Sequence, residues 1–158
     1  MKLKLKILFL VLFIYSNINA TIITVNNTLT GAGQFTQIDP AITSAAAGDT
    51  IYVSGSVNAY SACNITKSIT LLGPGSFSSK QNGFPASIGE ITFSSNVSNV
   101  TIAGFKITTS IYVSKFTVSL NSNINNVTIR NNTFPAGAFG LYFNALSNSS
   151  NFLISGNI

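Results

Sequence analysis

Side chains that could carry out acid–base chemistry are few and widely spaced in this sequence. The only carboxylates are Asp39, Asp49 and Glu90, and the 158 residues include no histidine. General acid–base cleavage of a glycosidic bond needs two flanking carboxyl groups, and a Ser-His-Asp triad needs an imidazole base. We interpret Asp39 as part of a helix start, Asp49 as a turn residue and Glu90 as a strand-edge residue. The sequence therefore predicts no catalytic residue in this segment.

Metal and cofactor sites are not indicated either. Calcium sites usually include carboxylates, and neither an EF-hand loop nor a Gly-Gly-x-Gly-x-Asp repeat occurs. Cys63 is the only cysteine, so it cannot form an intramolecular disulfide, and we interpret it as a small buried apolar residue. Arg130, the only arginine, has no acidic residue near it in the sequence and is interpreted as an outward-facing strand residue. We expect no metal and no cofactor.

Aromatic side chains in the last third of the chain are the candidate carbohydrate contacts. Tyr112, Phe139 and Tyr142 could present rings to a sugar, although alternate aromatics in a strand are more often core residues. Both interpretations stay open at this stage.

The first twenty residues have the outline of a secretory signal peptide. Lys2, Lys4 and Lys6 precede an apolar run at residues 7–15, and a short polar stretch ends at Ala20. The run is too short to cross a membrane, which takes about 20 apolar residues, so we expect no membrane span after removal of the leader. We expect cleavage after Ala20 and a secreted or cell-surface location. The composition of the leader resembles that of low-GC Bacteroidetes-type bacteria.

Positive charge after the leader is sparse. The cations are spread along the chain, never adjacent, and only slightly outnumber the three carboxylates. They are Lys67, Lys80, Lys106, Lys115 and Arg130. Nucleic-acid binding usually requires a clustered basic surface. We expect no nucleic-acid partner.

A column of Gly or Asn residues follows short apolar-x-apolar triplets at intervals of roughly 25 residues, a spacing typical of solenoids. Gly and Asn enter the left-handed backbone region at low energy, so the column predicts one bend per coil. Its members are Gly55, Gly73, Gly104, Asn131 and Gly156. Aligned positions should stack, with Val100, Val127 and Phe152 in one internal row and Ile102, Ile129 and Ile154 in another. Asn99, Asn126 and Asn151 align as well, and we expect their amides to hydrogen-bond along the stack.

The same pattern predicts the elements. We expect an opening strand at residues 21–25, a helix at about 38–47 that covers the first coil, and Gly48 as its C-terminal stop. Alternating apolar residues then predict strands at 50–54, 68–72, 90–93, 99–103, 111–113, 116–120, 126–130, 141–143 and 152–155. Residues 76–89 are interpreted as a loop. The sequence predicts an all-β parallel solenoid with about five or six coils, wound right-handed because parallel crossovers prefer that hand.

These residues resemble a known superfamily. Residues 35–54, residues 126–134 and Gly140-Leu-Tyr-Phe143 are similar to the cap, first coil and later repeats of secreted right-handed parallel β-helix proteins with the pectin-lyase-like fold. The resemblance covers residues 21–158 and implies a cap at 21–49 and coils at 50–158. It implies a range of activities, from polysaccharide lyases and hydrolases to tailspikes, adhesins and non-catalytic surface repeats.

Two functions follow as expectations. The first is an exported non-catalytic module that binds polysaccharide or acts as an adhesin-type surface protein. The second is the N-terminal fragment of a polysaccharide lyase or glycoside hydrolase whose catalytic coils lie beyond residue 158. Because no polar segment closes the last repeat, we expect missing C-terminal coils or another chain to cover that end.

Overall fold

The computed structural model describes residues 20–28, 32–76, 83–114, 123–138, 140–143 and 148–158, and of residues 112–114 it describes the backbone only. The predicted strand at 116–120 and the candidate contact Phe139 lie outside these ranges.

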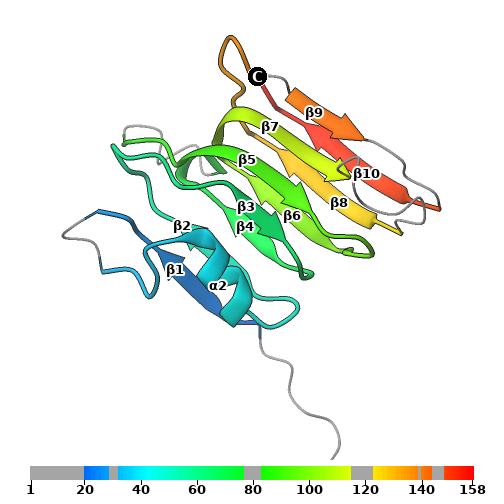
Figure 1. Ribbon diagram of the computed structural model, residues 1–158, viewed down its shortest axis with the longest axis horizontal. Helices are drawn as coiled ribbons and strands as arrows, with labels where there is room; N and C mark the ends of the chain where they lie inside the picture. Colours follow the sequence, from blue (N-terminus) through cyan, green and yellow to red (C-terminus); the bar gives the residue numbers. More distant parts are fainter. Residues whose placement is uncertain (1–19, 29–31, 77–82, 115–122, 139, 144–147) are drawn as a thin grey trace, which may run out of the picture.

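The described strands form two parallel sheets that share one core. The first sheet is ordered β1 (Ile22–Val25), β2 (Thr50–Val53), β4 (Thr70–Leu72), β6 (Val100–Ala103), β8 (Asn125–Arg130) and β10 (Ser150–Ser155). The second sheet is ordered β3 (Cys63–Ile65), β5 (Ser87–Phe93), β7 (Lys106–Ser114) and β9 (Gly140–Phe143). From β2 onward the chain alternates between the sheets, so each pair of strands makes one turn of a solenoid (Figure 1). The predicted parallel β-solenoid is confirmed.

The solenoid has about four turns, fewer than the five or six expected. Four strands of the second sheet are described, and the first sheet adds one strand at each end. Each turn supplies one described strand to each sheet. The hand of the winding stays the expectation stated above.

The internal rows follow the predicted register. Ile102 pairs with Ile129 and Ile129 with Ile154, while Val127 pairs with both Val100 and Phe152. The isoleucine row continues through every strand of the first sheet: Ile23, Ile51, Leu71, Ile102, Ile129 and Ile154. Equivalent side chains therefore pack on one another from coil to coil, as both predicted rows require.

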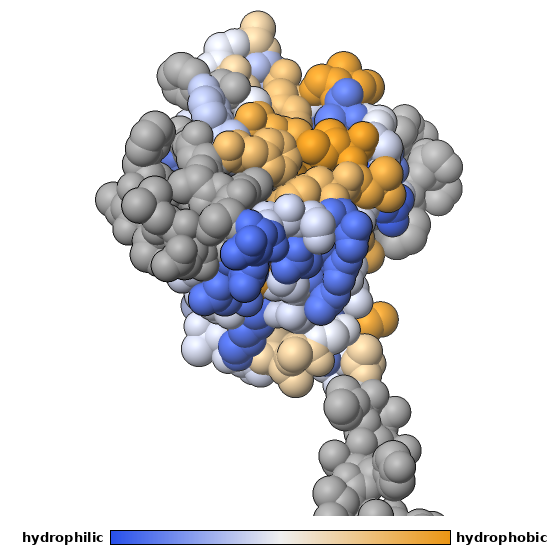
Figure 2. All heavy atoms as spheres, turned by 90° about the vertical axis from the view of Figure 1, so that its right-hand side faces the viewer, coloured by the Kyte–Doolittle hydropathy of each residue, from blue (hydrophilic) through white to orange (hydrophobic). Residues whose placement is uncertain are grey.

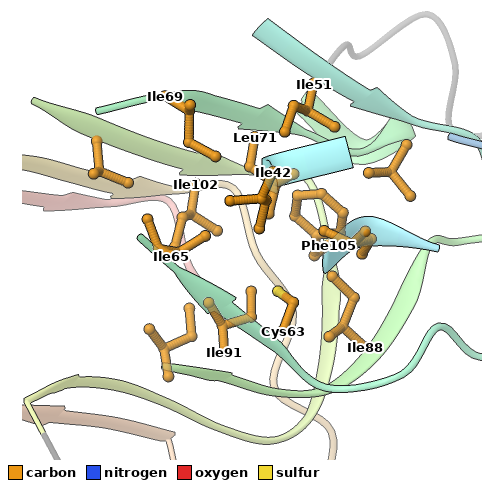
Figure 3. Packing of buried hydrophobic residues seen from close by; sticks show 14 of the residues in the cluster. Ile42, Ile51, Cys63, Ile65, Ile69, Leu71, Ile88, Ile91, Ile102 and Phe105 are labelled. Atoms are coloured by element: carbon orange, nitrogen blue, oxygen red, sulfur yellow. The ribbon is translucent and has the colours of Figure 1, made fainter. Parts of the chain in front are cut away.

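The core lies between the inner faces of the two sheets. Leu71 and Ile102 from the first sheet face Ile65 and Ile91 from the second (Figure 3), and all four side chains are fully buried. Because neighbouring strands of a parallel sheet are joined by longer connections, this core is built from residues distant in sequence.

Helix α2 (Ile38–Ser44) packs against β1, β2 and β3 and buries Ile38, Ala41 and Ile42 (Figure 1). The predicted extension to residue 47 is wrong, because Ala45 is already extended, with φ of −63° and ψ of 145°. At the end of the helix, Lys67 donates hydrogen bonds from Nζ to the carbonyl oxygens of Thr43 (2.6 Å) and Ala45 (2.7 Å). A cation at this position satisfies the last carbonyls and complements the helix dipole.

Asparagine side chains link successive coils. Asn126 Nδ2 donates to Asn99 Oδ1 at 2.9 Å, and Asn151 Nδ2 donates to Asn126 Oδ1 at 3.0 Å. All three residues have positive φ, between 56° and 58°. The predicted amide stack is confirmed, and the same residues also form left-handed bends that their alignment alone did not indicate.

Three strands of the second sheet differ clearly from their predicted ranges. β7 begins at Lys106 rather than residue 111 and is nine residues long. β3 was missed because it is only three residues long and has no flanking Gly or Asn. β5 begins at Ser87 rather than residue 90, with a register irregularity between Ile88 and Glu90, where Gly89 interrupts the apolar alternation.

The internal row gives a direct stability prediction. Ile129 is fully buried in the row, whereas Thr128 is partly exposed on the outer face of the same strand. We expect Ile129→Ala to lower the free energy of unfolding by about 2–5 kcal/mol. Thr128→Ala is the matched control, with an expected change below about 1 kcal/mol. Urea denaturation of both variants measures this, and equal losses would contradict the stacked row.

Candidate functional site

A groove of about 750 Å³ runs along the bends that follow β4, β6, β8 and β10. We call it the bend groove. One wall is formed by the 3-10 turn η1 (Pro74–Ser76) and by residues 83–85, which precede β5. The groove therefore spans several coils of the solenoid, and neighbouring bends contribute to it at regular intervals.

Glycines of the predicted column allow this wall to lie close to the bends. A Cβ atom on Gly104 would lie 2.0 Å from the backbone nitrogen of Ser76, and one on Gly73 would lie 2.4 Å from the carbonyl oxygen of Gly104. Backbone hydrogen bonds join the same segments, with Gly75 N donating to Gly104 O at 3.1 Å. Any side chain at Gly104 would push η1 away from the bend.

The column itself serves two different purposes. Gly104, Asn131 and Gly156 have φ of 80°, 54° and 61°, in the left-handed region as predicted. Gly55 and Gly73 are not among the described residues with positive φ, so the predicted left-handed bend is wrong at these two positions. Their lack of a side chain instead permits contact with backbone, since a Cβ on Gly55 would lie 1.8 Å from the carbonyl oxygen of Phe84.

The floor of the groove is fixed by buried amide hydrogen bonds. Asn132, which is 1% exposed, accepts a hydrogen bond from Phe105 N at 3.0 Å and donates to Ile102 O at 3.2 Å. Asn157 repeats the arrangement one coil later, accepting from Asn132 N at 3.0 Å and donating to Ile129 O at 2.9 Å. These amides are committed to the fold.

Other side chains of the groove are available to a ligand. Phe84 is 61% exposed, and Asn131 and Thr133 are exposed at the bend after β8. Lys106 is partly exposed and also lines the groove. An aromatic ring, an amide, a hydroxyl and a cation thus line one concave surface.

Of the three candidate aromatic contacts, Tyr142 is the one whose side chain is described, and it does not line this groove. Tyr142 lies on β9 in the second sheet, where its backbone pairs with that of Tyr112. It is absent from the residues that line the groove, whereas the side chain of Tyr112 and all of Phe139 lie outside the described part of the chain. Sequence reasoning missed Phe84 and Lys106, because nothing local distinguishes either residue from its neighbours.

The carboxylates have separate structural roles. Asp39 Oδ1 accepts a hydrogen bond from Asn64 N at 3.0 Å, and the Asp49 carboxylate accepts from Thr21 N and Ala46 N, both at 2.8 Å. Glu90 lies partly buried on β5. Across the described ranges, no cluster of three or more His, Cys, Asp or Glu side chains could hold a metal ion. Neither Asp39, Asp49 nor Glu90 lines the bend groove.

Cys63 is buried on the inner face of β3, and burial raises the pKa of its thiol well above its ordinary value. The nearby Asp39 carboxylate raises the pKa further. A thiol of this kind is unreactive, because the nucleophile is the thiolate.

The end of the solenoid at β9 and β10 presents apolar side chains (Figure 2). Leu153 is 56% exposed, Ile154 46% and Ile158 86%. Ile154 is the last described member of the internal isoleucine row, so one side of it contacts solvent instead of a further coil. Phe143 packs edge-on against Phe152, with ring centres 5.3 Å apart.

Within the described ranges, none of the helical structure has both the length and the apolar character needed to span a membrane. No known protein family, no curated protein and no solved structure matches the chain.

The close approach at Gly104 gives a prediction with an internal control. Gly137 also has positive φ, but a Cβ on it would meet no atom within 4 Å. We expect Gly137→Ala to destabilise the protein by about 1–2 kcal/mol from backbone strain alone. Gly104→Ala should lose at least about 1–3 kcal/mol more, because the added carbon overlaps Ser76. Thermal unfolding of both variants measures this, and equal losses would contradict the packing role of Gly104.

The environment of Cys63 predicts resistance to alkylation. We expect no measurable modification by iodoacetamide in the folded protein at pH 8, and rapid modification after addition of guanidinium chloride. Mass spectrometry of both samples checks this. Equal rates in the two samples would contradict the burial of this thiol.

Proposed function

We propose that this chain is an exported, non-catalytic β-solenoid module that binds a polysaccharide in the bend groove. The single observation behind this assignment is the combination of Phe84, Lys106, Asn131 and Thr133 around one open concavity. The proposal includes a right-handed winding and membership of the pectin-lyase-like superfamily. The resemblance to secreted parallel β-helix proteins supports it.

The chemistry of the groove suits a sugar chain. A sugar ring offers an apolar face that packs on an aromatic side chain and hydroxyls that pair with amides and hydroxyls. Phe84 supplies the ring, and Asn131 and Thr133 supply exposed hydrogen-bonding groups in the same groove. Because the groove crosses bends from four successive strands of the first sheet, it suits a linear ligand of several units.

Binding without cleavage fits the positions of the carboxylates. Acid–base attack on a glycosidic bond needs two carboxyl groups near the bond. Asp39 and Asp49 belong to the helix and turn at the other end of the solenoid from β10, where they accept backbone hydrogen bonds. The predicted leader would deliver the module to the cell surface or the medium, where polysaccharides are available.

The exposed apolar edge of β10 favours a second candidate. Further coils stacked on β10 would cover Ile154 and could carry paired carboxylates on one sheet face. In that case the described coils are the N-terminal part of a polysaccharide lyase or glycoside hydrolase. A longer reading frame with paired Asp or Glu in later coils would support it, as would release of unsaturated uronates by the longer protein.

Binding to a glycan array, followed by titration of the best ligand, tests the first candidate. We expect Phe84→Ala and Lys106→Ala each to weaken binding by about tenfold, since each removes one contact worth roughly 1–1.5 kcal/mol. Both side chains are at least partly exposed, so the variants should keep the circular dichroism spectrum of the parent.

Tyr142→Ser is the matched control, because Tyr142 lies on the second sheet outside the groove. Its affinity should equal that of the parent. Loss of binding in Tyr142→Ser with full binding in Phe84→Ala would move the site to the second sheet. Release of product by the chain itself would contradict a non-catalytic role.

A further inference from the structure

The Asp49 carboxylate is buried and tied to the start of the first strand. The residue is only 4% exposed. Its Oδ1 accepts a hydrogen bond from the backbone nitrogen of Thr21, and its Oδ2 accepts one from the backbone nitrogen of Ala46, each at 2.8 Å. Burying a charged carboxylate costs free energy unless hydrogen bonds compensate, so this arrangement is unusual for a residue in a turn.

Thr21 occupies a defined place at the beginning of the fold. Its carbonyl oxygen accepts a hydrogen bond from Thr50 N at 2.9 Å, and β1 begins at the next residue. Two hydrogen bonds therefore fix the backbone of Thr21. Its nitrogen donates to Asp49 Oδ1, and its own carbonyl oxygen accepts from Thr50 N. Ala20 and Thr21 are both exposed.

The predicted leader ends at the same point, since the polar stretch after the apolar run closes with Ala20. We propose that the Ala20–Thr21 peptide bond is the processing site and that Asp49 is the receptor for the α-ammonium group that cleavage creates on Thr21. This inference rests on the export component of the proposed function and is independent of polysaccharide binding.

The processing step is a hydrolysis by an export-associated endopeptidase. One water molecule is consumed, the Ala20 carbonyl carbon gains an oxygen and leaves as a carboxylate, and the Thr21 nitrogen keeps its bond to Cα. The bond between the Ala20 carbonyl carbon and the Thr21 nitrogen breaks. The nitrogen gains the two protons of the water molecule and is an ammonium group at neutral pH. All described strands and α2 lie between Ile22 and Ser155, so the processed chain retains them.

Cleavage changes the kind of hydrogen bond that Asp49 accepts. Before cleavage the donor is a neutral amide 2.8 Å from a carboxylate oxygen, and cleavage would put a cation in its place. Because the Asp49 carboxylate is ionised, this hydrogen bond is charge-assisted in both states. Cleavage adds the Coulomb attraction between two opposite unit charges. The two amide hydrogen bonds hold the pKa of Asp49 below its ordinary value, with a smaller contribution from the Lys67 ammonium, so the carboxylate is charged at neutral pH.

The first experiment expresses the full chain with its leader in a secreting bacterial host and sequences the N-terminus of the released protein. We expect Thr21 as the first residue. A product that begins at any other residue overturns the proposed processing site. If the host released no protein, export and the processing site would both be overturned. The glycan-binding proposal would not be affected, because it is tested on purified protein.

The second experiment measures the role of Asp49. The protein beginning at Thr21 is compared with one beginning at Ala20, which keeps the Thr21 N–H as a neutral donor but moves the ammonium one residue away. We expect the Ala20 form to have a roughly five- to tenfold larger equilibrium constant for unfolding at pH 6.5. Introducing Asp49→Asn into both forms should abolish this difference, even though it destabilises both.

The pH dependence of the difference provides a second readout. An ion pair raises the pKa of the α-ammonium, so the advantage of the Thr21 form is complete below the ordinary α-amino value and is lost as pH rises through the raised value. Asp49 has a lowered pKa, so the advantage is lost at the acidic end as pH falls through that lowered value. Equal stabilities of the two forms at pH 6.5, or a difference that persists in Asp49→Asn, would overturn the assignment.

Discussion

Register between successive coils is the constraint on which the rest of this structure depends. Each inner position of the first sheet packs directly on the same position of the coils before and after it, at the strand spacing of about 4.8 Å. A slip of one residue would turn every inner side chain outward, because side chains alternate between the two faces. The row from Ile23 to Ile154 shows how strictly this is kept, with Leu71 as the one departure from isoleucine.

Asparagine helps to fix that register because one residue performs two tasks. At Asn99, Asn126 and Asn151 the backbone adopts the left-handed bend, and the amide side chain hydrogen-bonds to its equivalent in the neighbouring coil. Glycine could supply the bend but not the amide. At Asn132 and Asn157 the same chemistry is turned inward, where it satisfies backbone groups beneath the bend groove. The polar composition of the chain is therefore part of its packing.

Much of this fold could be predicted because its information is local and repeated. Alternation gave the inner rows, and recurrent Gly or Asn gave the bends at Gly104, Asn131 and Gly156. Features that depend on distant partners could not be obtained in this way. The carbonyl groups at the end of helix α2 are satisfied by Lys67, which is distant in sequence, and Gly73 is required by its approach to Gly104, not by its own backbone angle. Phe84, Lys106 and Thr133 all line the bend groove. They come from three separate segments of the chain, so their proximity depends on the fold and not on local sequence.

The uniform stacking also bears on how such a chain can change in length over evolution. Contacts between strands in each sheet join neighbouring coils only, so the interface between any two coils resembles the next one. Duplication or deletion of one whole coil would leave two matching surfaces to meet again, with the asparagine and isoleucine rows unbroken. Insertion or deletion of a few residues within a strand would break both rows. Lineages of this protein should thus differ by multiples of a coil, and the groove would lengthen or shorten in equal steps.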